Sequence, residues 1–174
     1  MLTYVEGRCK KIPMMHPMLM LCAHTGARIS EVRRLRVADL DLKAGTVLFR
    51  EKKKSKSSDT LRRGRLTSAL VGTLAGWLTG KHPGGSFVFC REPEVVLTDH
   101  VVKNLFRRAV KNSKWSVLRG YHVLRHSFAS NLAAAGTDQR VIDELMGHTT
   151  EEMRKRYRHL FPEQKDAAVL GVYG

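Results

Sequence analysis

The chain has 174 residues, 43% of them hydrophobic, which is enough for one domain with a packed core and too few for two domains of ordinary size. Its 31 lysines and arginines against 16 aspartates and glutamates give a net charge of +15, which indicates a polyanionic partner, nucleic acid in the first place. The sequence has no apolar run long enough to span a membrane and no signal peptide, which argues against a membrane protein. The three cysteines include no C-x-x-C pair, which argues against a disulfide framework and a metal site and indicates a cytoplasmic protein with reduced thiols.

Apolar spacing, capping residues and helix breakers predict a mostly helical chain. In chain order, the predicted helices span 14–24, 27–38, 68–78, 99–110, 121–135, 139–146 and 150–160. The predicted strands span 46–53, 60–67 and 86–90. We therefore expect an α+β fold, mostly α-helical, in which three short strands form one small antiparallel sheet at the edge of a single domain over residues 1–174.

Positive charge concentrates in two regions of the chain. The predicted hairpin between Thr46 and Thr67 carries eight basic and two acidic residues, and the stretch from Val101 to Thr137 has seven lysines or arginines and no acidic residue. A solvated face usually mixes both signs of charge, so stretches of one sign favour a surface that faces phosphates. The predicted DNA contacts in these regions are Lys52, Lys54, Lys56, Arg62, Arg63, Arg107, Arg108, Lys111 and Arg119.

A small set of residues has the chemistry of a phosphate-handling site. His122 and Arg125 are three residues apart on a predicted helix, and an arginine fork there can hold two phosphate oxygens. Taken singly, each candidate has a plainer explanation: H-x-x-R suits a surface pair, and Arg28 is one of 31 basic residues. His148 follows a glycine and suits a helix cap, while Tyr157 suits a half-buried core position. The individual residues therefore do not decide the function.

Four short blocks follow one another along the chain: T-G-A-R-I-S-E-V at 25–32, H-V-L-R-H-S-F-A at 122–129, L-M-G-H at 145–148 and R-Y-R-H-L at 156–160. In this combination the sequence resembles the catalytic domain of the tyrosine recombinases, the phage integrase family, over nearly its whole length. The resemblance implies catalytic roles for Arg28, Lys53, His122, Arg125, His148 and Tyr157. It also implies that Glu31 orients the first arginine.

The hairpin lysine of this family has four candidates here. Lys53 aligns best, within the sequence R-E-K-K, but Lys52, Lys54 and Lys56 are close neighbours. The returning strand reads R-R-G-R-L where the family usually has V-P-L, and the turn is long. The resemblance therefore implies a catalytic lysine in the hairpin and leaves the choice among the four open.

The resemblance implies a specific reaction on double-stranded DNA. Tyr157 attacks a phosphodiester and gives a 3′-phosphotyrosyl bond with a free 5′-hydroxyl. The two arginines and His148 stabilise the charge on the phosphoryl oxygens, His122 or His148 accepts the tyrosine proton, and Lys53 protonates the leaving oxygen. Because the covalent bond preserves the energy of the phosphodiester, the family needs no metal, nucleotide or other cofactor. The implied partners are DNA and further protomers of the same protein, as a tetramer on DNA.

Other functions remain open on the sequence alone. A type IB topoisomerase-like nicking and closing enzyme uses a similar residue set without strand exchange, although the short spacing from L-M-G-H to Tyr157 favours the recombinase. A DNA-binding module without catalysis would need only the charge. A metal-binding protein built on the eight histidines has no ligand spacing to support it.

The N-terminal domain with which full-length family members clamp the other face of the DNA has no counterpart here, because T-G-A-R begins at residue 25. We expect either an excised catalytic domain or a short relative, which binds DNA weakly and with a steep salt dependence. The amphipathic tail over 163–174 is expected to pack on its own core or on a neighbouring protomer, and both arrangements stay open.

Overall fold

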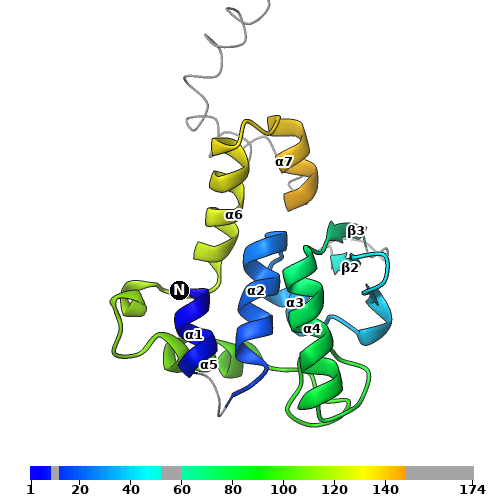
Figure 1. Cartoon of the computed structure of the whole chain (residues 1–174), viewed down its shortest axis with the longest axis vertical. Coiled ribbons are helices and arrows are strands. Elements are labelled where there is room, and N and C mark those ends of the chain that lie inside the picture. The colour runs from blue at the N-terminus through cyan, green and yellow to red at the C-terminus, as the bar shows by residue number, and fades with distance from the viewer. Residues whose placement is uncertain (9–11, 52–59, 148–174) are drawn as a thin grey trace, which may run out of the picture.

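The computed structural model describes residues 1–8, 12–51 and 60–147 (Figure 1). Its helices are α1 (Leu2–Arg8), α2 (Met15–Thr25), α3 (Ile29–Arg33), α4 (Ser68–Gly80), α5 (Asp99–Val110), α6 (His122–Ala134) and α7 (Gln139–Met146), with 3₁₀ turns η2 (Val37–Asp39) and η3 (Lys114–Val117). Strands β1 (Leu40–Asp41), β2 (Thr46–Glu51) and β3 (Thr60–Arg65) form an antiparallel sheet in the order β1-β2-β3. The predicted α+β class is confirmed. No helix within these residues is long and apolar enough to span a bilayer.

Helix α2 is the centre of the fold. It lies between α4 on one side and α1 with α5 on the other, and α6 contacts it near its C-terminal end (Figure 1). The fully buried side chains on this helix are Met15, Met18, Leu19, Leu21 and Cys22. The helix is buried on all sides because it is apolar around its whole circumference. The helix predicted over 14–24 is confirmed, with its bounds shifted by one residue.

The helix predicted over 27–38 is wrong in length, because α3 has five residues and ends at Arg33. The backbone beyond it is extended and pairs with a distant segment. The N–H of Val88 donates to the carbonyl of Leu35 at 2.9 Å, and the N–H of Val37 donates to the carbonyl of Ser86 at 2.8 Å. These long-range bonds take the place of the next helical turn.

The third strand of the sheet also differs from the prediction. It is β1, which pairs with β2, whereas residues 86–90 form no strand and make a single bridge, Arg36↔Phe87. A strand at 86–90 would use its backbone carbonyls to pair with a neighbouring strand, but the carbonyl of Val88 accepts a hydrogen bond from Nε1 of Trp77 at 2.7 Å. The segment is therefore held by α4 and by the backbone of residues 35–37, and not by the sheet.

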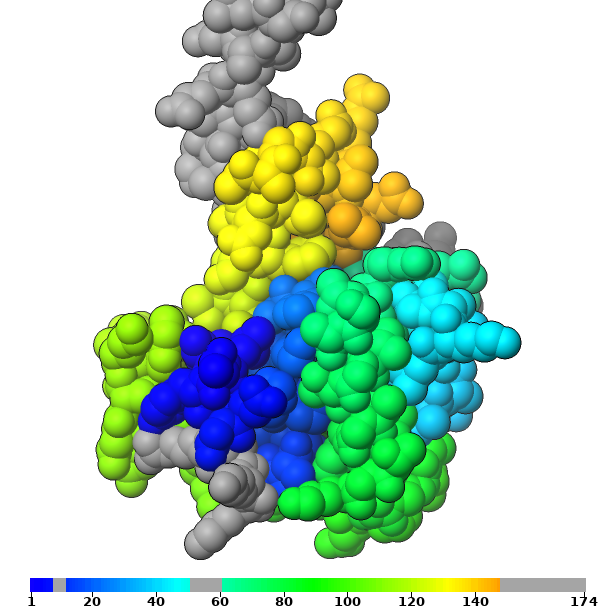
Figure 2. Space-filling model, in the orientation of Figure 1, coloured from blue at the N-terminus to red at the C-terminus, as the bar shows by residue number. Residues whose placement is uncertain are grey.

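Helices α6 and α7 form a pair that projects from the main body (Figure 2). Small residues of α6 and larger residues of α7 form a separate buried cluster of Ala129, Ala133, Ile142 and Met146. Helix α7 begins after its N-cap, Asp138, whose carboxylate accepts the N–H of Arg140 at 2.8 Å. It ends at Gly147, which has a φ of 62°. Both predicted helices, over 121–135 and 139–146, are confirmed.

Lowering the pH is expected to destabilise the fold through His24. Its Nδ1 lies 3.0 Å from the hydroxyl of Thr67, the N-cap of α4, and burial lowers the pKa of His24 below its ordinary value. The unfolded chain therefore binds more protons than the folded chain in this range. The stability that neutral His24 contributes is fully present above its unfolded pKa, about 6.5, and is lost as the pH falls from there through its lower folded pKa.

The urea midpoint at about pH 7.5 and about pH 5.5 measures this effect. The decrease in the urea midpoint between these two pH values should be smaller in His24→Asn than in the wild-type protein, because asparagine keeps an acceptor near Thr67 but does not titrate. The exposed His100→Asn is the control and should keep the wild-type decrease. Equal decreases in all three proteins would show that His24 is not responsible.

Candidate active site

The structure describes part of the predicted catalytic set. The predicted residues within it are Arg28, Glu31, His122 and Arg125. Those that lie outside the described residues are Lys52, Lys53, Lys54, Lys56, His148 and Tyr157, together with the predicted helix over 150–160 and the tail over 163–174. The arginines, and the elements that hold them, form the described part of the site.

Arg28 is held at the start of α3 by Glu31. The backbone N–H of Arg28 donates to Oε2 of Glu31 at 2.8 Å, and Nη1 donates to Oε1 at 3.1 Å. The Glu31 side chain is 2% exposed, so its carboxylate requires these donors in the interior. Nη2 of Arg28 also reaches the carbonyl of Gly147 at 3.0 Å. Glu31 thus fixes both the backbone and the guanidinium of Arg28, which is the geometry that an orienting residue needs.

Arg125 points from α6 into the region between α2 and α7. The residue is 6% exposed, and its terminal nitrogens donate to two backbone carbonyls, Nη1 to Gly26 and Nη2 to Met146. His122, one turn earlier, is exposed at the first residue of α6. The structure therefore brings Arg125 and Arg28 together at the end of α7 and places His122 on the surface.

A third arginine, Arg62 of β3, belongs to the same centre. Its Nη2 donates to Oε2 of Glu31 at 3.0 Å, and its Nη1 donates to the carbonyl of Leu145 at 2.6 Å. We predicted Arg62 as a DNA contact; in the structure only 8% of the residue is exposed, and its guanidinium faces the interior. The signal in the sequence is the strand period: residues 62 and 64 are buried, while Leu61 and Arg63 are exposed.

The three arginines bind three consecutive carbonyls at the end of α7. Arg62, Arg125 and Arg28 donate to the carbonyls of residues 145, 146 and 147, in that order. The last carbonyls of a helix have no partner within it and carry a partial negative charge, so three cations are favourable there. We call these three residues the arginine clamp. It holds the end of α7 directly before His148, another residue of the predicted set.

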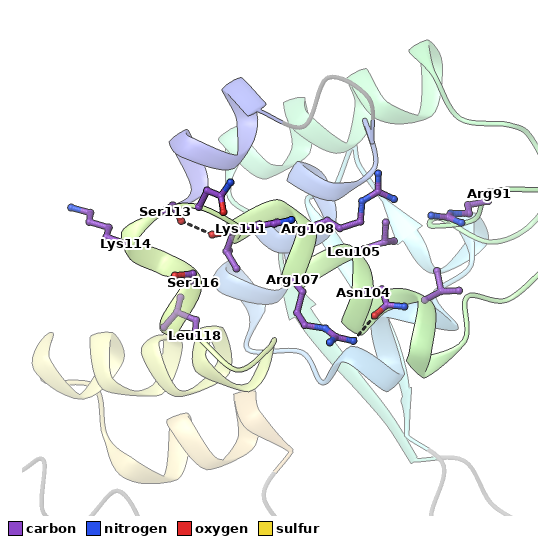
Figure 3. Close-up of a pocket in the computed structure, with 13 residues that line it drawn as sticks. Arg91, Asn104, Leu105, Arg107, Arg108, Lys111, Ser113, Lys114, Ser116 and Leu118 are labelled. Atoms are coloured by element: carbon purple, nitrogen blue, oxygen red, sulfur yellow. Dashed lines mark hydrogen bonds between the residues drawn. The ribbon is translucent and has the colours of Figure 1, made fainter.

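Several of the other predicted DNA contacts lie around a second feature, on α5 and the turn after it. Arg107, Arg108 and Lys111 are exposed, and together with Arg91 and Lys114 they line a cavity of about 960 Å³ (Figure 3). None of the described residues that line this cavity is acidic. The remaining predicted contacts in the described part of the chain, Arg63 on β3 and Arg119 before α6, are also exposed. These side chains are available to an anionic partner.

The described part of the chain contains no group of three or more histidine, cysteine, aspartate or glutamate side chains that could hold a metal ion. Cys22, beside the clamp, is not a nucleophile. Burial raises the pKa of its thiol far above the ordinary value, and the carboxylate of Glu31 raises it further. The described chemistry of the site is therefore that of guanidinium groups and one buried carboxylate.

The chain is similar to several known proteins. It matches the model of the phage integrase family over residues 2–164. Tyrosine recombinase XerC of Bacillus pumilus (strain SAFR-032) is 30% identical over 140 residues, 78% of this chain and 46% of the relative. The solved Tn1549 transposon integrase in complex with transposon right end DNA gives a TM-score of 0.77 at 18% identity, over 99% of this chain and 63% of that chain. The catalytic domain of bacteriophage HP1 integrase gives a TM-score of 0.69 at 24% identity, over 97% and 89%.

The chain spans about half the length of the curated relatives that it matches, between 46% and 50% for three of them. The structural likeness shows that the fold is that of a tyrosine recombinase catalytic domain. The sequence likeness runs through the segments that carry Arg28, Arg62 and Arg125, all of which lie within residues 2–164.

Proposed function

The chain belongs to the phage integrase family, and on that premise we propose that it is the catalytic domain of a site-specific DNA recombinase that cuts and rejoins DNA through Tyr157. The observation that supports this function best is the arginine clamp. Two of its three guanidinium groups, those of Arg28 and Arg62, bind one buried carboxylate, Glu31, so the three arginines and this carboxylate together carry an excess of positive charge. A phosphodiester under attack supplies the matching negative charge.

The proposed reaction transfers a phosphoryl group and leaves its energy in a covalent bond. Oη of Tyr157 attacks the phosphorus, the bond to the 5′-oxygen breaks, and the leaving oxygen takes a proton from Lys53. Arg28 and Arg125 stabilise the charge that builds on the non-bridging oxygens. Because a free tyrosine has a pKa of about 10, a histidine of the predicted set accepts its proton. Attack by a 5′-hydroxyl of another strand reverses the step and joins the new ends without a metal or a nucleotide.

The proposed DNA-binding surface is basic, and its binding is mostly independent of the DNA sequence. It comprises the exposed Arg63, Arg107, Arg108, Lys111 and Arg119, with the hairpin residues Lys52, Lys54 and Lys56. Contacts of this kind go to phosphates, so they set affinity and its salt dependence and carry little sequence information. The Tn1549 integrase, whose fold this chain shares, was solved with DNA bound.

Strand exchange between two duplexes also implies an assembly. Each duplex is cut on both strands, and each cut uses one Tyr157, so the proposed unit is a tetramer on DNA that acts in the cytoplasm. The tail over 163–174 is proposed to pack on its own core or on the next protomer. The relatives are recombinases and integrases, so the topoisomerase alternative is not favoured.

Covalent trapping tests the nucleophile. Nicked duplexes tiled across the DNA that flanks the gene lose a short 5′-hydroxyl fragment on cleavage, so religation stops and the adduct accumulates. The wild-type protein is expected to give an adduct that resists SDS, in EDTA, whereas Tyr157→Phe gives none because it lacks the attacking oxygen.

The control for folding in this experiment is the DNA affinity of Tyr157→Phe, which should equal that of the wild-type protein. An adduct that survives Tyr157→Phe would show that another residue is the nucleophile. An adduct that forms only with added metal would contradict the proposed chemistry. Products that join two different duplexes, as opposed to relaxed plasmid alone, distinguish the recombinase from a topoisomerase.

A further inference from the structure

Arg62 is an interior arginine for which β3 and β2 form a fitted site. In the sheet it is paired with Phe49, and its guanidinium lies over the Phe49 ring, 4.5 Å from the ring centre. Two positions along the strand, Gly64 leaves room for that ring, because a Cβ there would lie 3.0 Å from Cε2 of Phe49. The adjacent Arg63 points outward and is exposed. The strand therefore holds a planar cation in one orientation.

Arg62 connects two parts of the site that are distant in the sequence. It donates to Glu31, 31 residues away, and to the carbonyl of Leu145, 83 residues away. Glu31 in turn binds both the backbone and the guanidinium of Arg28. The position of Arg28 relative to the end of α7 therefore depends on a residue that is shielded from solvent.

We propose that Arg62 is a positioning residue for DNA cleavage, which through Glu31 and the Leu145 carbonyl keeps Arg28 and the end of α7 at one fixed spacing. This inference rests on the proposed function. Its role requires an arginine, because a lysine keeps the charge but is a compact donor on a flexible stem. A lysine at this position has no planar group to stack on Phe49 while two nitrogens reach two acceptors.

The variant Arg62→Lys tests the proposal, with Arg65→Lys, an exposed arginine of the same strand that is not among the proposed DNA contacts, as the matched control. The rate of adduct formation is measured in a single turnover at saturating nicked DNA, beside the Kd for the same DNA. We expect Arg62→Lys to lower the rate about 100-fold, the effect of a small misplacement of catalytic groups, and to leave the Kd unchanged. Arg65→Lys should keep the wild-type rate.

A DNA substrate with a neutral methylphosphonate at the cleaved bond distinguishes a defect in positioning from a loss of folded protein. It carries one charged oxygen fewer, so its cleavage depends less on Arg28, and the defect of Arg62→Lys should shrink on it. A variant that is merely less folded would lose the same fraction on both substrates. Phe49→Leu, which removes the ring beneath the guanidinium but keeps an apolar residue, should show the same pattern more weakly.

The outcomes separate this proposal from the function on which it rests. An unchanged rate in Arg62→Lys, or an equal defect on phosphodiester and methylphosphonate, would overturn the positioning role while the wild-type adduct still supports the recombinase. The absence of any adduct with the wild-type protein would overturn the recombinase and this role together. A lower rate whose defect is larger on the phosphodiester than on the methylphosphonate, with unchanged Kd, is the result that supports it.

Discussion

Replacing Arg125 with methionine is expected to lower the free energy of unfolding by about 2–4 kcal/mol, because two buried carbonyls lose their donor. These are the carbonyls of Gly26 and Met146, which accept from the two terminal nitrogens of Arg125. Methionine is flexible and keeps most of the space filled, so the change reports the lost hydrogen bonds more than a cavity. Urea unfolding followed by circular dichroism measures it, and the exposed Arg119→Met should change stability by less than about 0.5 kcal/mol.

The same position should be even more sensitive in catalysis. Arg125→Lys retains the charge and recovers part of the stability, but it lacks the fork that holds two acceptors at once. We expect its rate of adduct formation to fall by about 10²–10³-fold, the usual effect of removing one donor to a developing oxyanion. A folded Arg125→Lys that forms adduct at the wild-type rate would show that this residue serves only the packing of α6 on α2 and α7.

The helices with their own boundary signals could be predicted from the sequence. The hydroxyl of Thr98 accepts the N–H of Val101 at 3.3 Å, and the carboxylate of Asp138 accepts the N–H of Arg140 at 2.8 Å. Such caps act within one turn, so a few neighbouring residues contain the information. The same holds for Gly147, whose left-handed conformation ends α7 at the predicted residue.

The elements that depend on distant partners could not be predicted in this way. The apolar spacing over 27–38 continues past Arg33, yet the chain leaves the helix because Leu35 and Val37 bond to residues 86–88. Strand β1 has two residues, Leu40–Asp41, and exists through its pairing with β2. No local pattern distinguishes these choices, since each is decided by a partner about 5 to 50 positions along the chain.

The residues of the candidate site likewise fall into those that the sequence predicts and those that depend on distant partners. Arg28 and Arg125 could be assigned from the order of the motifs, but the burial of Arg62 depends on Glu31 and on a carbonyl of α7. In the sequence R-R-G-R, Arg62 is indistinguishable from the exposed Arg63 unless the inward face of the strand is known. Charge alone predicted DNA contact for both, and the burial of one of them is a tertiary effect.

Gly26 is the residue whose substitution should disturb most of the site at once. It has a φ of 61°, and a Cβ there would lie 2.5 Å from Cδ1 of Phe128 and 2.8 Å from Sδ of Met146. Gly26→Ala is therefore expected to lower the free energy of unfolding by about 3 kcal/mol, about 1 from the left-handed backbone and the rest from overpacking. The urea midpoint measures the loss.

Two further variants separate these causes. Gly72→Ala in α4, where a Cβ meets nothing within 4 Å, is the control and should raise stability by about 0.5–1 kcal/mol, because alanine suits a helix interior better than glycine. The double variant Gly26→Ala with Phe128→Leu should recover part of the loss if the clash with the ring is real.

Because the carbonyl of Gly26 accepts from Arg125, any separation of α6 from α2 also displaces that arginine. Gly26→Ala should then cleave nicked DNA more slowly even at temperatures where it is fully folded, and wild-type cleavage by a destabilised Gly26→Ala would show that the clamp tolerates movement of α6.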